Sequence, residues 1–308
     1  MDDPSPSSDL GDLIDSISRD WHEAVCEGVL PQHVIPAVGI HAYASLHEID
    51  DPPDAAICFP PLRADAELAD HYRSALSARL VAACASIQSA LQTMRNGLGL
   101  HSAIAACRRA NESLWKAFWL CNPELDGATR IHRLLILMRH ELNEVLGVFS
   151  QEVNSAAEII LRRHERDIRQ VTGKDDYRPR LGRDEYLGYI ELRADDPLTP
   201  RMPPVPDGVD GGAVVWSIMS NLTHPNLVFD WIMMTQDNPD DLMERLQLAS
   251  VGGAMTAVAN ISTIVMRQAQ IPEHPIAEVS KAFRGPIFAA GFHLLSEYEQ
   301  AVNRAGQV

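Results

Sequence analysis

The sequence predicts an all-α protein, a bundle of about six main helices with one long insertion rich in Pro and charge. Apolar residues from Ile131 to Val153 lie three or four residues apart, which places them on one helix stripe. The same steps recur from Leu68 to Met94. No sustained alternating strand pattern appears, and aromatic residues make up only 6% of the chain. The core is therefore expected to consist of Leu, Ile, Val, Ala and Met.

Composition favours a soluble, globular chain of the cytoplasm. The chain is 46% hydrophobic and carries a net charge of −16, a field that repels nucleic acid and promotes solubility. The residues from Met1 to Asp15 are rich in Asp, Ser and Pro, unlike a signal peptide. Five cysteines without a CxxC pair predict reduced, buried thiols: Cys26, Cys58, Cys84, Cys107 and Cys121.

The predicted N-terminal region, residues 1–66, consists of a disordered start, a short helix and an irregular segment laid over the bundle. It precedes the main helical domain at residues 67–308. Residues 1–9 are predicted to be disordered, and a short helix is predicted from Leu10 to Cys26, ending at Gly28. From Leu30 to Pro61 the chain is rich in Pro and His and has no sustained period. We expect an irregular segment there, with one short extended piece before Pro60 and Pro61.

Helices of the main domain follow from apolar periodicity and from their stop signals. The helix from Leu68 to Met94 ends at Asn96-Gly97, and Asn122-Pro123 closes the next one. A fourth helix begins near Asp126, and its pattern extends to Gln170. The insertion is predicted at residues 174–212. The remaining expected helices are Ser102–Cys121, Ala213–Thr223, a restart from Pro225 to Met234, Pro239–Ala269 and Ile276–Ala305.

The run from Leu246 to Met266 carries no charge and is long enough to cross a bilayer. It also contains Gln247, Ser250 and Asn260, which are costly for a solitary span in lipid. We therefore expect the buried central helix of the bundle and no membrane anchor.

His224 is the strongest single candidate for a functional residue. It precedes Pro225 between two apolar helical patterns, so it lies at a bend or a helix start. With Ser220 and Asn221 about one turn upstream, its imidazole could be oriented for proton transfer. The alternative is a histidine that only caps and joins the two helices.

Arg95 and His101 form a second candidate, in the stretch RNGLGLH. The guanidinium could stabilise a phosphate while the imidazole moves a proton. The structural alternative is a helix–helix turn through Gly-Leu-Gly, with His101 opening the next helix.

Arg109, Glu112, Trp115 and Trp119 are spaced to share one helix face. Such a set could form the floor of a ligand pocket, to which Arg109, Glu112 and Trp115 would contribute. Alternatively, it is an interior polar clamp that joins helices.

Two further patterns favour ordinary surface chemistry. His140 and Glu144 share a helix face but lack the second His of a zinc protease, so no metal and no other cofactor is expected. The basic run from Arg162 to Arg183 is interleaved with acidic residues, which favours pairing along a helix over an anion-binding patch.

The segments AIAACRRANESLWKAFWLCNPELDGATRIHRLL and SIMSNLTHPN resemble a pattern in uncharacterised all-helical actinobacterial proteins. That group is distantly similar to HEPN-type helical bundles, some of which are metal-independent ribonucleases in toxin or defence systems. The HEPN signature places an Arg shortly before a His. Upstream of His224 the chain has Ser217, Ile218 and Met219 instead, and Arg95 with His101 sits in a glycine turn.

We therefore expect a non-enzymatic or degenerate HEPN-like protein. The long fourth helix and the acidic surface favour action by binding a protein or ligand, with a homodimer as one expected assembly. The alternatives are a metal-independent ribonuclease, for which RNA would be the partner, and an enzyme with a small-molecule pocket between helices.

Overall fold

The computed structural model describes residues 6–47, 63–96, 100–145 and 239–272, together with separate helical positions between 155 and 166. Within these ranges every regular element is a helix and none is a strand, so the predicted all-α class is confirmed. Buried side chains from all of these helices except the separate positions form one continuous core.

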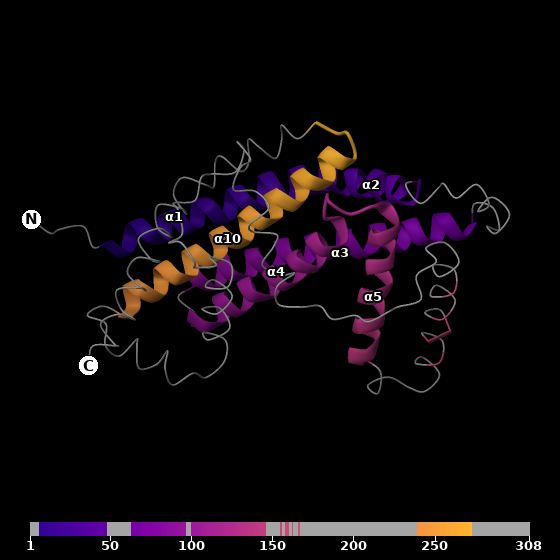
Figure 1. The fold of residues 1–308 in the computed structure, drawn as a ribbon. Coiled ribbons are helices and arrows are strands. Elements are labelled where there is room, and N and C mark those ends of the chain that lie inside the picture. The colour runs from indigo at the N-terminus through magenta and orange to yellow at the C-terminus, as the bar shows by residue number, and fades with distance from the viewer. Residues whose placement is uncertain are drawn as a thin grey trace, which may run out of the picture.

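The N-terminal helical segment, residues 6–47, is one nearly continuous helical run (Figure 1). It comprises α1 (Pro6–Trp21), the π-helix η1 (His22–Val34) and α2 (Ile35–His47). The predicted disorder is therefore wrong for residues 6–9, and the predicted irregular segment is wrong from Leu30 to His47. This segment packs on α3 and α10, so it belongs to the same bundle as the later helices.

The π-helix explains why apolar periodicity did not reveal η1. The N–H of Ile35 bonds to the carbonyl of Leu30, five residues back, as in a π-helix. The buried side chains Val25, Leu30 and Val34 are accordingly spaced by five and four residues. Pro31 lies inside the run; it lacks an N–H, and in an α-helix its ring would clash with the carbonyl four residues earlier. The wider π-helix accommodates this proline, and its buried residues therefore do not recur every 3.6 residues.

The centre of the bundle is the helix pair α3 (Arg63–Arg95) and α4 (Leu100–Cys121), which pack along much of their length. Both confirm the helices predicted from periodicity. The predicted α3 stripe is buried at Leu68, Tyr72, Leu76, Leu80, Ala83, Ile87 and Leu91. Alanines of α4 allow the two backbones to approach closely, and they are buried at positions 103, 106, 110 and 117.

Helix α5 (Gly127–Val145) begins where the sequence predicted. Asp126 caps it, since its Oδ1 accepts a hydrogen bond of 2.6 Å from the backbone N–H of Thr129. Its first turns bury Ile131 and Leu134, and it crosses the other helices steeply, with its far end pointing away from them (Figure 1). The predicted extension to Gln170 lies mostly outside the described residues.

Helix α10 (Pro239–Gln268) confirms the predicted helix and its burial, whereas the central position belongs to the α3–α4 pair. It contacts α4, α3, α2 and η1, and most of its side chains from Leu246 to Met266 are buried. Length and composition alone would also let Leu68–Arg95 and Leu246–Gln268 cross a membrane, but the core helices of soluble proteins pass the same test.

The end of α10 is a Schellman motif. The N–H of Gln270 bonds to the carbonyl of Arg267 at 3.0 Å, and the N–H of Ile271 bonds to that of Met266 at 2.9 Å. Gln270 has a φ of 57°, in the left-handed region that normally favours glycine. Ile271 packs back against the core and completes the cap.

Several predictions lie outside the described residues: the insertion at 174–212 and the helices expected within 213–234 and 276–305. The number of six main helices therefore stays a prediction. The predicted domain boundary between residues 66 and 67 falls inside α3 (Arg63–Arg95).

Candidate functional site

The site predicted around His224, with Ser220 and Asn221, lies outside the described residues. The backbone of His101 opens α4 as predicted, but its side chain also lies outside the described set. These residues remain sequence-based hypotheses.

Arg95 is engaged with the N-terminal helix. Its Nε lies 2.8 Å from Oδ1 of Asp15, so the guanidinium at the end of α3 forms an ion pair with α1. The pair lies at the surface, where such contacts contribute little stability. Arg95 therefore joins α3 to α1, whereas the turn predicted through Gly-Leu-Gly lies outside the described residues.

Glu112 pairs with Arg108 and not with Arg109. Glu112 Oε1 accepts from Nε of Arg108 at 3.1 Å, one helical turn away. Trp115 is partly buried against the core and Trp119 is buried, whereas Arg109 is exposed. The 3.6-residue period allowed both pairings, and side-chain geometry selected the i, i+4 pair.

A buried polar chain, absent from the sequence predictions, joins three helices. The Tyr72 hydroxyl of α3 donates to the carbonyl of Leu120 at the end of α4, at 2.6 Å. His41 Nε2 of α2 lies 3.0 Å from the same hydroxyl. Because Tyr72 has one proton and gives it to Leu120, we assign the His41 Nε2–H as the donor to Tyr72.

Burial, together with the nearby Arg130, lowers the pKa of His41 to about 3. Its imidazole therefore stays neutral at physiological pH. Beside it, the Ser45 hydroxyl donates to the His41 carbonyl at 2.8 Å, and the Arg130 guanidinium lies 3.5 Å from Ser45 Oγ. These contacts join α2 to α3, α4 and α5, so the polar groups hold the helices together.

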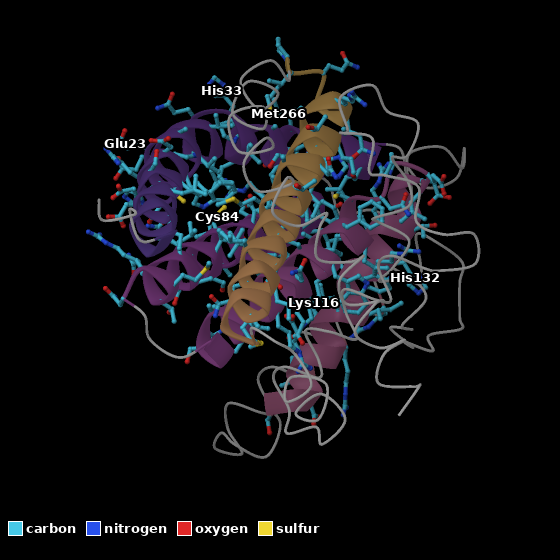
Figure 2. The ribbon with its side chains drawn as sticks, turned by 90° about the vertical axis from the view of Figure 1, so that its left-hand side faces the viewer. Glu23, His33, Cys84, Lys116, His132 and Met266 are labelled. Carbon is cyan, nitrogen blue, oxygen red and sulfur yellow. The ribbon has the colours of Figure 1, made fainter. Side chains whose placement is uncertain are left out.

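A second polar junction joins α3, α4 and α5 around Glu141, with Lys116 marking its place in Figure 2. The Glu141 carboxylate accepts from Arg79 and, at 3.1 Å, from Lys116. Partial burial raises its pKa, but Arg79 and Lys116 outweigh that effect and the net pKa is lowered. Glu141 is thus held as a carboxylate, so it joins helices and is a poor proton donor.

The described residue with the strongest chemical activation is Cys26 in η1. The neighbours that lower the pKa of its thiol are Cys84 of α3 and His22, one turn earlier. The effect of Cys84 outweighs the opposing effect of burial, and together with His22 it lowers the pKa of Cys26 to about 7. His22 Nε2 is 3.0 Å from Oε1 of Glu27. Cys26 is partly exposed and Cys84 is buried, and both are free thiols.

The outward face of α2 is apolar and uncharged. Ile40 and Tyr43 are 49% and 47% exposed, and Pro36, one turn before Ile40, is also exposed. Helix α2 contains no Asp, Glu, Lys or Arg, although the whole chain carries a net charge of −16. Interfaces are depleted of charge at their centre and enriched in Tyr, so this face has the composition of a contact surface.

Among the described residues, no group of three His, Cys, Asp or Glu side chains is close enough to hold a metal ion. A search of family models, curated proteins and solved structures found no match to this chain. The described part of the chain is an all-α bundle. Its function has to be argued from the side chains described above.

Sequence reasoning missed both the thiol pair and the His41–Tyr72 contact. Cys26 and Cys84 are 58 residues apart, and His41 and Tyr72 are 31 apart. A local signal did exist for part of the site, since His22, Cys26 and Glu27 share a turn of helix. It was hidden because the chain around Pro31 does not follow an α-helical period.

Proposed function

We propose that this chain is a non-enzymatic interaction protein of the cytosol that binds a second copy of itself through the outward face of α2. The observation that carries the proposal is the charge-free α2 helix with Ile40 and Tyr43 about half exposed. A degenerate HEPN-like bundle, the expectation from the sequence resemblance, is compatible with such a role.

The charge of the chain favours α2 as the place where two copies meet. Two molecules that each carry −16 repel one another. That repulsion is smallest between surfaces without charge, and burying Ile40 and Tyr43 adds a favourable apolar term of roughly 25 cal/mol per Å². Across a two-fold axis the same patch would serve both partners.

Polar side chains that join the described helices support a binding role in a different way. His41, Arg95 and Glu141 each join helices through a described contact. They build a rigid scaffold on which α2 is held, since Tyr72 and Arg130 approach its inner side while Ile40 and Tyr43 face outward.

Sedimentation velocity over a range of protein concentrations tests the dimer. We expect a concentration-dependent dimer that strengthens as salt rises, because salt screens the like-charge repulsion. Ile40→Asp with Tyr43→Asp should give a monomer that remains folded by circular dichroism.

Val81→Asp is the matched control, since Val81 is an equally exposed apolar residue, at 50%, on α3. It should leave the dimer intact. A wild-type chain that stays monomeric at every concentration, or a dimer indifferent to the α2 double variant, would overturn the proposal.

The alternative function is a metal-independent ribonuclease, with His224 or the pair Arg95 and His101 as its site. Incubation of the purified chain with mixed RNA in EDTA tests it. RNA cleavage that disappears in His224→Ala would replace the binding-only proposal. A rise in melting temperature with one member of a metabolite panel would instead favour a small-molecule enzyme.

A further inference from the structure

An exposed ion pair on α3 borders the outward face of α2. Asp70 and Arg73 lie one helical turn apart, with 3.1 Å between Oδ1 of Asp70 and Nη2 of Arg73. Their side chains are 53% and 49% exposed. The stem of Arg73 passes close to α2, because a Cβ added at Gly39 would lie 3.5 Å from Cδ of Arg73. The pair is therefore both accessible and next to the helix that carries the proposed contact.

The N-terminal helical segment and α3 lie side by side and run antiparallel (Figure 1). Ser18 of α1 accepts a hydrogen bond from Gln88 at 3.1 Å. Further along the segment, His41 of α2 contacts Tyr72. The contact positions on α3 thus move back toward its start as the segment advances toward the end of α2.

This direction sets the order of side chains along the border. Arg73 lies at the level of Gly39, and Asp70, one turn closer to the start of α3, lies toward the end of α2. Tyr43 follows Gly39 by four residues, so both are on the same side of α2. The ion pair therefore follows one edge of the face that Ile40 and Tyr43 form.

We propose that Asp70 and Arg73 form the polar rim of the α2 dimer, where Arg73 of each subunit pairs with Asp70 of the partner subunit. This inference rests on the proposed dimer and names the side chains that fix its register. A two-fold interface brings the same patch of both copies together, so a rim of a single charge sign would repel itself. A rim with one cation and one anion is complementary to its own copy.

The exchange of partners costs little within each subunit. An exposed ion pair one helical turn apart stabilises its helix only slightly, because water screens both charges. At the edge of an apolar contact the same charges lie in less polar surroundings and attract each other more strongly. In a chain with 42 acidic and 26 basic residues, a balanced border beside the uncharged α2 helix is what self-association requires.

Charge reversal tests the pairing, with sedimentation velocity as the measurement. Arg73→Asp leaves two anions on the rim, and Asp70→Arg leaves two cations. Each variant should raise the Kd of the dimer about tenfold, since two attractive contacts become repulsive. Asp70→Arg also changes the net charge from −16 to −14, so repulsion between whole chains would by itself make that variant dimerise more tightly. The two explanations predict opposite signs for this variant.

Mixing the two single variants separates contacts between subunits from contacts within one. With one variant fluorescently labelled, an equimolar mixture should form a heterodimer with a lower Kd than either homodimer. The double swap, Asp70→Arg with Arg73→Asp, should restore the wild-type Kd, because complementarity returns with the signs exchanged. Circular dichroism should show the same helical content in every variant.

Arg19→Asp is the matched control. Arg19 is also an exposed helix arginine, but it lies on α1, before η1, and its reversal gives the same net charge as Arg73→Asp. It should change the Kd by less than about twofold. A wild-type monomer would overturn the proposed function together with this inference. A dimer that the α2 double variant abolishes, but that tightens with Asp70→Arg or shows no preference for the mixed pair, would overturn this inference alone.

Discussion

The N-terminal helical segment and the α3–α4 pair differ in how regularly they are built. In α3 and α4 the buried residues follow the 3.6-residue period from end to end, and small alanines line the contact. In the N-terminal segment an α-helix gives way to a π-helix and then to an α-helix again. The activated thiol, the buried imidazole and the exposed apolar face all lie in this irregular segment.

This difference separates stability from chemistry. A regular pair of helices can bury nearly every large side chain, but it leaves little room for reactive groups. A wider helical turn changes which residues share a face, and π-helical turns are often found at functional sites. Substitutions in the regular helices should therefore change mainly the free energy of unfolding, while those in the irregular segment should also change reactivity or assembly.

The largest expected effect is a charge placed in the regular core. Ile261→Asp in α10 puts a carboxylate at a position with no exposed surface, and it should cost about 3–5 kcal/mol of unfolding free energy. Val258→Asp should behave similarly. Urea denaturation followed by circular dichroism measures the change.

The control for that substitution is Gly253→Asp on the same helix. Gly253 is exposed, and a new Cβ there would meet no neighbouring atom within 4 Å. This variant should stay close to wild type. Equal losses at Ile261 and Gly253 would contradict the placement of α10 in the core.

The next effect is a dependence on pH in the irregular segment. Burial and Arg130 lower the pKa of His41 from 6.5 to about 3, so the unfolded chain binds a proton more readily than the folded one. The contribution of His41 to the unfolding free energy is therefore fully present above about pH 6.5 and is lost as the pH falls toward 3. The unfolding free energy, measured at a series of pH values, should decrease as the pH is lowered from 7 to 5.

His41→Gln should flatten that pH dependence, because an amide can donate to Tyr72 without titrating. Glu141 also contributes stability that is lost in acid, because its pKa is lowered from 4.5, but that loss begins only below about pH 4.5 and so lies outside the range from pH 7 to 5. A slope between pH 7 and 5 that persists in His41→Gln would assign the effect to other groups.

A smaller effect is expected at the polar link between the two regions. Tyr72→Phe removes the hydroxyl that joins His41 to the Leu120 carbonyl and leaves both without this partner in the interior. The expected loss is about 1–3 kcal/mol of unfolding free energy. Tyr43→Phe, at a half-exposed tyrosine on α2, should change stability by much less. Comparable losses in both variants would show that the buried link contributes nothing specific.

The smallest effect concerns the end of α10. Gln270 has a φ of 57°, so Gln270→Gly should relieve backbone strain and stabilise the chain by about 1 kcal/mol. Gln268→Gly, still inside the helix, should destabilise it by a similar amount. A rise in the urea midpoint for the first variant and a fall for the second would confirm the Schellman cap.

Sequence alone determined the all-α class, helices α3, α4 and α10 and the start of α5, because each has a regular apolar stripe bounded by a recognisable cap or break. Periodicity could not find η1, since a π-helix has a different period and Pro31 argued for irregular chain. It also could not choose between Arg108 and Arg109 as the partner of Glu112, because both spacings are compatible with a helix.

Only the tertiary structure decided which distant residues meet. His41 reaches Tyr72, Arg79 reaches Glu141 and Cys26 reaches Cys84 through the packing of helices whose relative rotation no local pattern specifies. Burial then sets their chemistry. The pKa of the Cys26 thiol is lowered to about 7 by its neighbours, Cys84 and His22. The pKa of the Cys107 thiol is instead raised to about 12 by desolvation. Amino-acid identity supplies the group, but its neighbours and its access to water determine what it can do.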